Sequence, residues 1–331
     1  MRNITVLSVL VIISFSVYGQ DPVKNYALSM SFQTGFVYGQ ALELVYQNPN
    51  KNDHEFLSEL KWDMKPVFYL GMELNYGKTD IMSKPGFFSS VSFKAGFPGD
   101  TGIMEDRDWV SSENAELTHY SRHTNKTREF LWLDAAIGLS IPIKSIFYIN
   151  PFINCSWMRF AFTGRDGYGK YARVISPYND TYHPIDDNPN IFIYDGQNVI
   201  TYKQDWFLAA LGFTIGTNYF KPLLIDLTFR ISPLTYCVAM DEHLSILLLN
   251  GTYTAKQTYN DYTSLGLYIE PGCKISFNLR KIDFSLEVNY RYIGNTRGLA
   301  YKNNSRFPDL NHEAGAGLSV LDTRFIIKIQ F

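Results

Sequence analysis

Two pairs of polar side chains in this sequence could together activate a water molecule. Asp106 and Asp108 are two residues apart, and Asp241 and His243 have the same spacing. In extended backbone, residues two apart point to the same side, so the members of each pair share a direction. An imidazole held by a carboxylate is a general base near neutral pH, and a second pair of carboxylates can position the water and carry a shared proton. Such a site would hydrolyse a peptide bond without a serine nucleophile.

Neither pair is specific when taken alone. An Asp-x-Asp pattern at the start of a loop is also typical of a solvated turn or a cation site, and Asp-Glu-His is ordinary on a polar loop. The three cysteines, Cys155, Cys237 and Cys273, are odd in number and far apart, which fits neither a disulfide framework nor a metal site. We expect no metal, and the chemistry depends on whether the fold brings the two pairs together.

The end of the chain indicates which fold could do so. Phe325, Ile327, Ile329 and Phe331 fall on one face of an extended strand, and polar residues such as Lys328 fall on the other. Strands with one side toward lipid and one side toward a polar lumen are typical of bacterial outer-membrane β-barrels. We also expect the barrel-assembly machinery to bind the chain through the terminal aromatic residue, Phe331.

The same alternation of apolar and polar residues recurs along the chain and predicts ten strands. An even number lets a single-chain barrel close with both ends in the periplasm, and the connections alternate between short turns and long loops. The expected fold is all-β, a ten-stranded antiparallel transmembrane β-barrel with long extracellular loops. The predicted strands are 26–47, 55–77, 85–106, 125–143, 146–166, 198–219, 222–241, 259–279, 282–300 and 314–331.

The first residues predict export. Arg2 precedes a short apolar core, and Val17-Tyr18-Gly19 offers small-residue cleavage chemistry, so we expect residues 1–19 to be a signal peptide and residues 20–331 to form one barrel domain. Elsewhere, no stretch reaches the roughly 18 consecutive apolar residues that a spanning helix needs. The 23 Tyr and 24 Phe suit aromatic girdles at both membrane interfaces, and a net charge of -2 gives no reason to expect a nucleic-acid partner.

The alternation of side chains along the strands places one of the two pairs inside the barrel and the other outside. Asp106 and Asp108 fall on the lumen side when counted from the polar residues of their strand, and the third and seventh strands of ten lie almost opposite each other. Strict alternation along 222–241 would turn Asp241 and His243 toward lipid. A register change must intervene, and Pro233 is the place where we predict a β-bulge.

At these residues the chain resembles the omptins, a family of outer-membrane aspartyl endoproteases with a ten-stranded barrel. Asp106 and Asp108 match the family's aspartate couple, and Asp241 with His243 matches the aspartate–histidine dyad that activates water. The resemblance implies peptide or protein substrates at the cell surface and a site on the extracellular side. It extends over nearly the whole mature chain, through Glu43-Leu44-Val45-Tyr46, Leu57-Ser58-Glu59-Leu60-Lys61-Trp62, Met104-Glu105-Asp106-Arg107-Asp108-Trp109, Ser121-Arg122-His123, Arg159-Phe160-Ala161-Phe162-Thr163, Tyr202-Lys203-Gln204, Asp241-Glu242-His243 and the terminal Phe331.

The resemblance also implies cleavage beside basic residues, but with altered pockets. Glu43 matches one acid of the pocket for the residue before the scissile bond, whereas Ala239 stands where the second acid is expected. His119 replaces an acid that would contact the residue after the bond. A pocket with one carboxylate should still prefer Arg or Lys, although less strictly.

A lipid is the only accessory molecule that the resemblance implies. Omptins need lipopolysaccharide for activity, and Arg159 matches one of its basic contacts, whereas Asp205 stands where a second arginine is expected. Because carboxylates repel lipid phosphates, we expect this chain to use a different lipid from its relatives, or none.

Two other readings of the same barrel stay open. Long loops rich in Tyr and Asn between residues 171 and 198 would suit a non-enzymatic barrel, either an adhesin or a small pore. A barrel lipase would need a serine beside the histidine, and Ser245 is close, but no surrounding pattern supports it. Within so narrow a barrel, we expect Lys94, Asp226, Arg230, Glu287 and Arg291 to form salt-bridged layers that fill the lumen.

Overall fold

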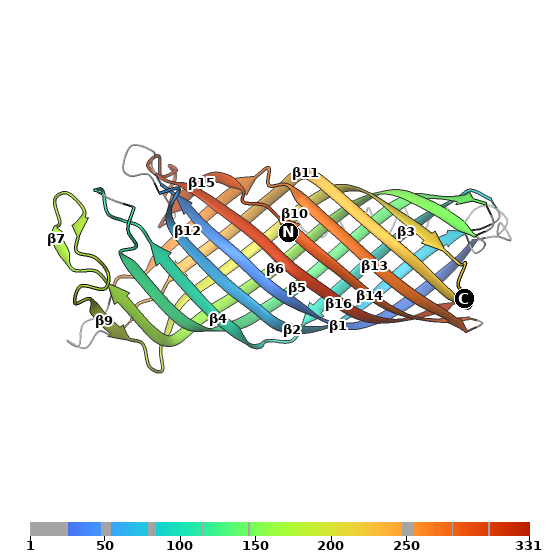
Figure 1. Ribbon diagram of the computed structural model, residues 1–331, viewed down its shortest axis with the longest axis horizontal. Helices are drawn as coiled ribbons and strands as arrows, with labels where there is room; N and C mark the ends of the chain where they lie inside the picture. The colour runs from blue at the N-terminus through green and yellow to red at the C-terminus, as the bar shows by residue number, and fades with distance from the viewer. Residues whose placement is uncertain are drawn as a thin grey trace.

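The computed structural model shows a long cylinder of antiparallel strands (Figure 1). It describes residues 26–47, 54–78, 82, 84–113, 115–144, 146–246, 254–279, 281–303 and 305–331. The predicted signal peptide, residues 1–19, lies outside the described residues. Among those described, no helix is long and apolar enough to cross a membrane.

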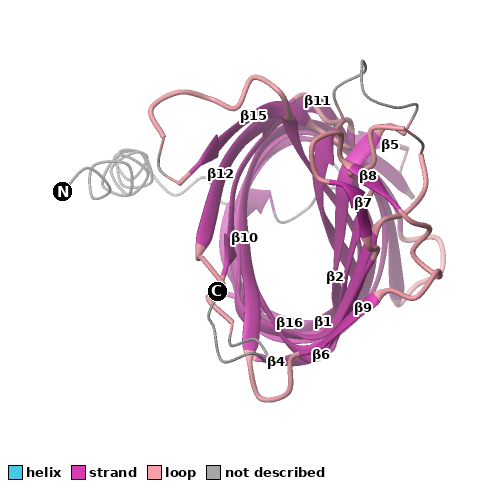
Figure 2. Cartoon of the chain, turned by 90° about the vertical axis from the view of Figure 1, so that its left-hand side faces the viewer, coloured by secondary structure: helices cyan, strands magenta, loops and turns pink. Residues whose placement is uncertain are grey.

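The ten predicted strands are confirmed, and they form a ring in which β1 pairs with β16. Seen along its axis, the ring is closed (Figure 2). In chain order its members are β1 (Tyr26–Tyr46), β2 (Phe56–Lys78), β3 (Gly86–Gly96) continued by β4 (Gly99–Asp108), β5 (His119–Ile143), β6 (Phe147–Tyr171), β10 (Asn198–Thr217), β11 (Leu223–His243), β12 (Gln257–Ser264) continued by β13 (Tyr268–Leu279), β14 (Ile282–Ile293) continued by β15 (Arg297–Lys302), and β16 (Glu313–Gln330).

Several strands extend further than predicted at the end of the barrel that carries the long connections. β5 begins at His119 rather than at residue 125, and β6 continues to Tyr171. The long connection after β6 also contains a small hairpin of β7 (Val174–Ser176) and β8 (Thr181–Tyr182), and β9 (Asn190–Ile193), which pairs with β6. The alternation of apolar and polar residues does not predict these extensions, because strands that leave the membrane have water on their outer side and need no apolar alternation.

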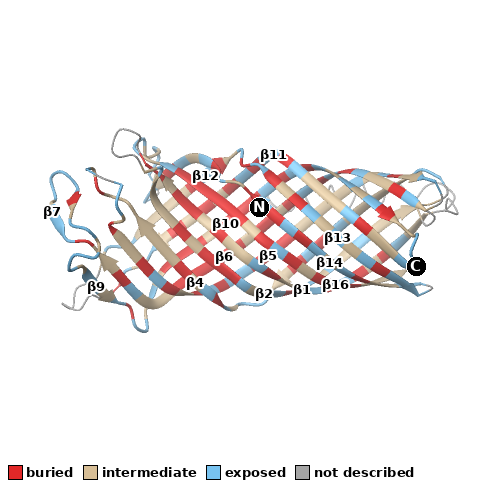
Figure 3. Cartoon of the chain, viewed as in Figure 1, coloured by how far each residue is buried: buried red, intermediate tan, exposed pale blue. Residues whose placement is uncertain are grey.

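A band of exposed apolar side chains surrounds the half of the barrel that holds the short turns. Along each strand these side chains alternate with buried ones, as the pattern of exposed and buried positions in Figure 3 shows. A hydrophobic belt on the outside of a closed β-cylinder is the surface that contacts lipid. It includes Leu28, Phe32, Phe68, Leu70, Val91, Phe93, Ile137, Ile153, Phe213, Leu227, Ile275, Leu286 and Phe325.

Inside the band, ion pairs and aromatic rings fill the cross-section. Nζ of Lys94 lies 2.6 Å from Oδ2 of Asp322, and both side chains are almost fully buried. Arg291 pairs with Glu270, and its guanidinium lies 3.8 Å from the ring centroid of Trp132. The predicted salt-bridged layers are therefore confirmed; further ion pairs join Arg230 to Glu270, Lys274 to Asp226 and Arg324 to Glu287.

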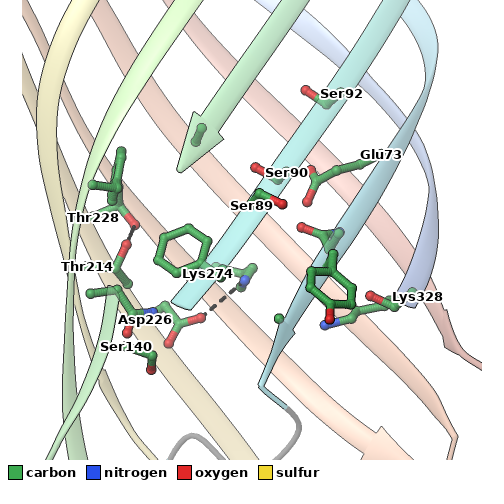
Figure 4. Close-up of a pocket in the computed structure, with 18 of the residues that line it drawn as sticks. Glu73, Ser89, Ser90, Ser92, Ser140, Thr214, Asp226, Thr228, Lys274 and Lys328 are labelled. Atoms are coloured by element: carbon green, nitrogen blue, oxygen red, sulfur yellow. Dashed lines mark hydrogen bonds and ion pairs between the residues drawn. The ribbon is translucent and has the colours of Figure 1, made fainter. Parts of the chain in front are cut away.

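A polar cavity of about 430 Å³ lies between these layers and the short turns. Figure 4 shows Ser90, Glu73 and Lys328 on its walls, together with the ion pair between Lys274 and Asp226. None of the residues that line it belongs to the two pairs that predict chemistry. The two pairs lie toward the opposite end of the barrel.

Candidate active site

The predicted bulge in β11 is present and is confirmed at Pro233. Before it, Asp226 and Ser232 are buried on the inner side; after it, the inner positions are odd-numbered and include Asp241. The pairing with β10 shifts at the same place, and the N–H of Leu234 is donated to Oγ of Ser232 at 2.8 Å. Because proline has no N–H to leave unpaired, it fits this position. The extra residue turns the rest of β11 around, so that Asp241 faces the interior.

The irregularity continues into the neighbouring strands. Leu265, in the break between β12 and β13, donates its N–H to the carbonyl of Thr235 at 3.0 Å. Gly294, in the break between β14 and β15, donates in turn to the carbonyl of Leu267 at 2.9 Å. These two breaks correct the uninterrupted strands predicted at 259–279 and 282–300, and they keep the hydrogen-bonded wall continuous past the bulge.

The dyad predicted from the sequence is formed. Nε2 of His243 lies 2.8 Å from Oδ2 of Asp241. The Asp241 side chain is almost fully buried, whereas that of His243 is 46% exposed, so the imidazole alone reaches solvent. The ring of Tyr259 stands edge-on to it, with centroids 5.9 Å apart. Both dyad residues lie beyond Tyr236, the last exposed large apolar side chain of β11.

The predicted couple lies on β4, between β2 and β5. Asp106 is opposite Leu60 on one side and Ser121 on the other, and the hydroxyl of Ser58 is 3.4 Å from Oδ1 of Asp106. β4 itself is set by a bulge near Gly102, whose φ of 110° is a conformation that glycine adopts readily. Around the ring, β5, β6 and β10 separate β4 from β11, which matches the predicted spacing of third and seventh strands.

The charges of the two pairs act on each other across the interior of the barrel. Burial raises the pKa of Asp106 well above its usual range, the charge of Asp108 raises it further, and the imidazolium of His243 opposes both effects. Burial also raises the pKa of Asp108 to about 6. For His243, burial lowers the pKa, but the carboxylates of Asp241, Asp106 and Asp108 outweigh it and bring the value to about 9. Asp106, Asp108 and His243 thus influence one another's pKa values.

Glu43 lies beside this cluster. It projects inward from β1, and only 4% of its surface is exposed. Burial raises its pKa, and the charges of Asp241, Asp261 and Asp106 add to this effect. Ala239 is buried on the inner side of β11, and the stacked rings of Trp62 and Tyr202, 5.5 Å apart, also lie in the interior. Asp261 was not predicted from the sequence.

His119 is next to the aspartate couple, directly opposite Asp108 in the pairing of β4 with β5. Its ring packs against Tyr171 and Tyr182, at centroid distances of 4.8 and 5.5 Å. Burial lowers its pKa, which favours the neutral imidazole. The position expected to carry an acid therefore forms part of an aromatic, uncharged wall.

Arg159 lies apart from these residues, on the outer side of β6. Its Nε is 2.8 Å from Oδ1 of Asp205, and one terminal nitrogen donates to Oδ2 at 3.0 Å, which makes a two-pronged ion pair. The indole of Trp157 donates to the same carboxylate at 3.2 Å. The guanidinium predicted to bind lipid is therefore paired within the protein.

The described part of the chain contains no group of three or more His, Cys, Asp or Glu side chains arranged to hold a metal ion. The cysteines that it includes, Cys155, Cys237 and Cys273, are unbridged. At the rim, the imidazole of His243 lies near several carboxylates.

The closed ring of strands and its apolar band define an outer-membrane β-barrel. The sequence model of the Omptin family matches residues 24–331, and the chain belongs to this family. Family membership and fold support an outer-membrane protease, a hydrolase.

Solved structures confirm the fold. The outer-membrane protease OmpT from Escherichia coli superposes with a TM-score of 0.72 at 18% identity, over 92% of this chain and 97% of that chain. The translocator domain of the autotransporter NalP from Neisseria meningitidis aligns over 99% of this chain and 95% of that chain, with a TM-score of only 0.31 at 8% identity. No curated protein sequence matches the chain.

Proposed function

We propose that this protein is an endopeptidase that cleaves peptide bonds beside basic residues, using a water molecule activated between the dyad and the aspartate couple. One observation carries the proposal. The imidazole of His243 is held at 2.8 Å by a buried carboxylate, while the charges of Asp106 and Asp108 act on it from the facing wall. A general base and a pair of carboxylates that share a proton are the groups needed to activate water and position it for attack.

The reaction uses the neutral form of His243. The imidazole takes a proton from the water as its oxygen attacks the peptide carbonyl carbon, and Asp241 stabilises the imidazolium that forms. The shared proton of Asp106 and Asp108 supports the developing negative charge on the carbonyl oxygen. The imidazolium then gives its proton to the leaving nitrogen, the C–N bond breaks, and the carboxyl and amine products separate.

Basic specificity is proposed from the charge beside the scissile bond. Glu43 is buried close to the dyad, and a buried carboxylate favours a guanidinium or ammonium partner. The wall formed by His119 and Tyr171 offers the residue after the bond an aromatic surface rather than an anion. Cleavage should therefore depend on Arg or Lys before the bond more than on a basic residue after it.

The active site is proposed to face the exterior of the cell, where protein substrates would reach it. Long connections surround the rim, whereas the C-terminus lies at the opposite end, and barrels of this kind have short periplasmic turns and long external loops (Figure 1). Phe331, 66% exposed at that other end, is accessible for recognition by the assembly machinery.

Lipid is proposed as a modulator rather than as a cofactor in the reaction. Arg159 would contribute to binding of lipopolysaccharide or another outer-membrane lipid, and its existing ion pair with Asp205 would compete with lipid phosphate. We therefore expect lipid to affect activity less than it would if the guanidinium of Arg159 were unpaired.

The proposal is tested with the refolded full-length barrel and a fluorogenic peptide containing one arginine. Wild type should cut beside the arginine, and Asp106→Asn and His243→Gln should each reduce kcat/KM by about 100- to 10,000-fold. Asp186→Asn is the matched control, because that carboxylate is 84% exposed on an outer connection. Heat-dependent mobility in gels verifies folding of each variant.

Undiminished cleavage in both rim variants would overturn the assignment. Steady single-channel conductance without any cleavage, with or without lipid, would instead favour a pore, and binding to host surfaces without cleavage would favour an adhesin.

A further inference from the structure

Three carboxylate oxygens, one within the dyad and two beside it, are buried and have no hydrogen-bond partner. They are Oε2 of Glu43, Oδ1 of Asp241 and Oδ1 of Asp261, and each side chain belongs to a residue that is at least nine-tenths buried. An isolated buried carboxylate is costly, so such acceptors indicate a place that a donor fills in another state of the molecule.

These carboxylates act on one another. The charges of Asp241 and Asp261 raise the pKa of Glu43 after burial itself. They project from three strands, the neighbouring β11 and β12 and, beyond β15 and β16, β1, so the cluster is not one acidic loop. An extended cation with several donors fits such a spread of acceptors better than a compact one.

Register explains how Asp261 came to be in the cluster. Ala239 of β11 is directly opposite Asp261 of β12, and both face the interior. Cβ atoms of directly opposed residues are about 4.5–5.5 Å apart, which is within the reach of a short side chain. The methyl group of Ala239 leaves space on its own strand, and the carboxylate lies on the adjacent one.

We propose that Asp261 is a specificity-determining residue, the second carboxylate of the pocket that receives the basic side chain, and that it acts with Glu43 in place of an acid at position 239. The inference rests on the proposed endopeptidase function. An arginine guanidinium carries five N–H donors in a rigid fork, enough to reach acceptors on more than one wall. The pocket then has two acids, and preference for Arg or Lys should be strict.

The test compares two peptides that differ only at the residue before the scissile bond, arginine in one and its neutral analogue citrulline in the other. Asp261→Asn should lower the arginine-to-citrulline ratio of kcat/KM by about 10- to 100-fold, since one charge-assisted contact is lost. Cleavage of the citrulline peptide should change little. An unchanged ratio in a folded Asp261→Asn barrel would overturn the proposal.

A second variant moves the carboxylate back across the strand pair. Adding Ala239→Asp to Asp261→Asn should restore most of the lost ratio, because the new acid would point into the same pocket. A folded double variant whose ratio stays at the level of Asp261→Asn would contradict a shared pocket. Asp186→Asn, on an outer connection, again serves as the control for a general loss of negative charge.

A binding measurement separates this inference from the proposed function. Agmatine, a small guanidinium compound, is titrated into each barrel and followed by tryptophan fluorescence. If wild type binds agmatine in an Asp261-dependent way but cuts neither peptide, the pocket is supported and the protease proposal fails. If wild type cuts after arginine and Asp261→Asn keeps the full preference, only the pocket fails. If it neither binds nor cuts, both are overturned.

Discussion

Oδ2 of Asp241 lies 2.8 Å from Nε2 of His243, and this contact sets the proton affinity of the proposed general base. Burial lowers the pKa of His243, while the carboxylates around it raise the pKa to about 9, Asp241 most strongly. The neutral imidazole is the active form, so kcat/KM should rise with pH as His243 loses its proton. Asp241→Asn removes the largest raising effect, and the rise should move to lower pH while maximal activity falls by about 100- to 10,000-fold.

The pH dependence of kcat/KM, measured in the free-enzyme regime, checks this prediction. Asp186→Asn should leave the profile unchanged. A profile of Asp241→Asn that keeps its rise at the wild-type pH would show that another group is the base.

The lumen ion pair between Lys94 and Asp322 predicts that losing one partner destabilises the barrel more than losing both. Lys94→Met removes the closer of two cations from the buried carboxylate of Asp322, the other being Arg324 at 3.6 Å, and should cost about 3–5 kcal/mol of unfolding free energy. Replacing both residues, as Lys94→Met with Asp322→Leu, should recover most of that loss because neither member of this buried ion pair remains. Urea unfolding in lipid vesicles measures both. A single variant as stable as wild type would contradict the buried pairing.

The ion pair between Arg159 and Asp205 predicts a change in lipid dependence. Asp205→Asn should release the guanidinium for phosphate groups and increase the stimulation of peptidase activity by lipopolysaccharide several-fold. Activity is assayed in detergent with and without added lipopolysaccharide. Arg159→Gln, which removes the cation, should show the opposite response. Equal stimulation in all three proteins would exclude a role for this ion pair.

His119 predicts the preference for the residue after the scissile bond. Replacing it by aspartate introduces a charge opposite Asp108, and kcat/KM for peptides with a basic residue after the bond should rise about 10-fold relative to neutral ones. A peptide library digest read by mass spectrometry measures this ratio. His119→Phe, which keeps the aromatic packing against Tyr171, should leave the wild-type preference in place.

Much of the barrel could be predicted because lipid imposes strict alternation on the strands. The ten segments, the lumen ion pairs and the bulge at Pro233 all follow from which side chains must face hydrocarbon. Strict alternation would turn Asp241 toward lipid, and this conflict predicts the bulge, since only an inserted residue could bring Asp241 inside. Beyond the apolar band this constraint ends, so the alternation does not predict the outer parts of β5 and β6.

Partners across strands could not be predicted, because register is not written in one strand alone. Asp261 looks like an ordinary polar residue until it is placed opposite Ala239. Asp205 likewise reads as a missing lipid contact, whereas in the structure it accepts two hydrogen bonds from Arg159. Both relationships depend on which residues adjacent strands place side by side.

The packed interior around Lys94, Arg291 and Trp132 lies between the proposed site at the rim and the end of the barrel that holds the short turns. Paired charges and stacked rings occupy this part of the barrel axis. Substitutions at the rim could then change substrate preference while the packed interior beneath it stays intact.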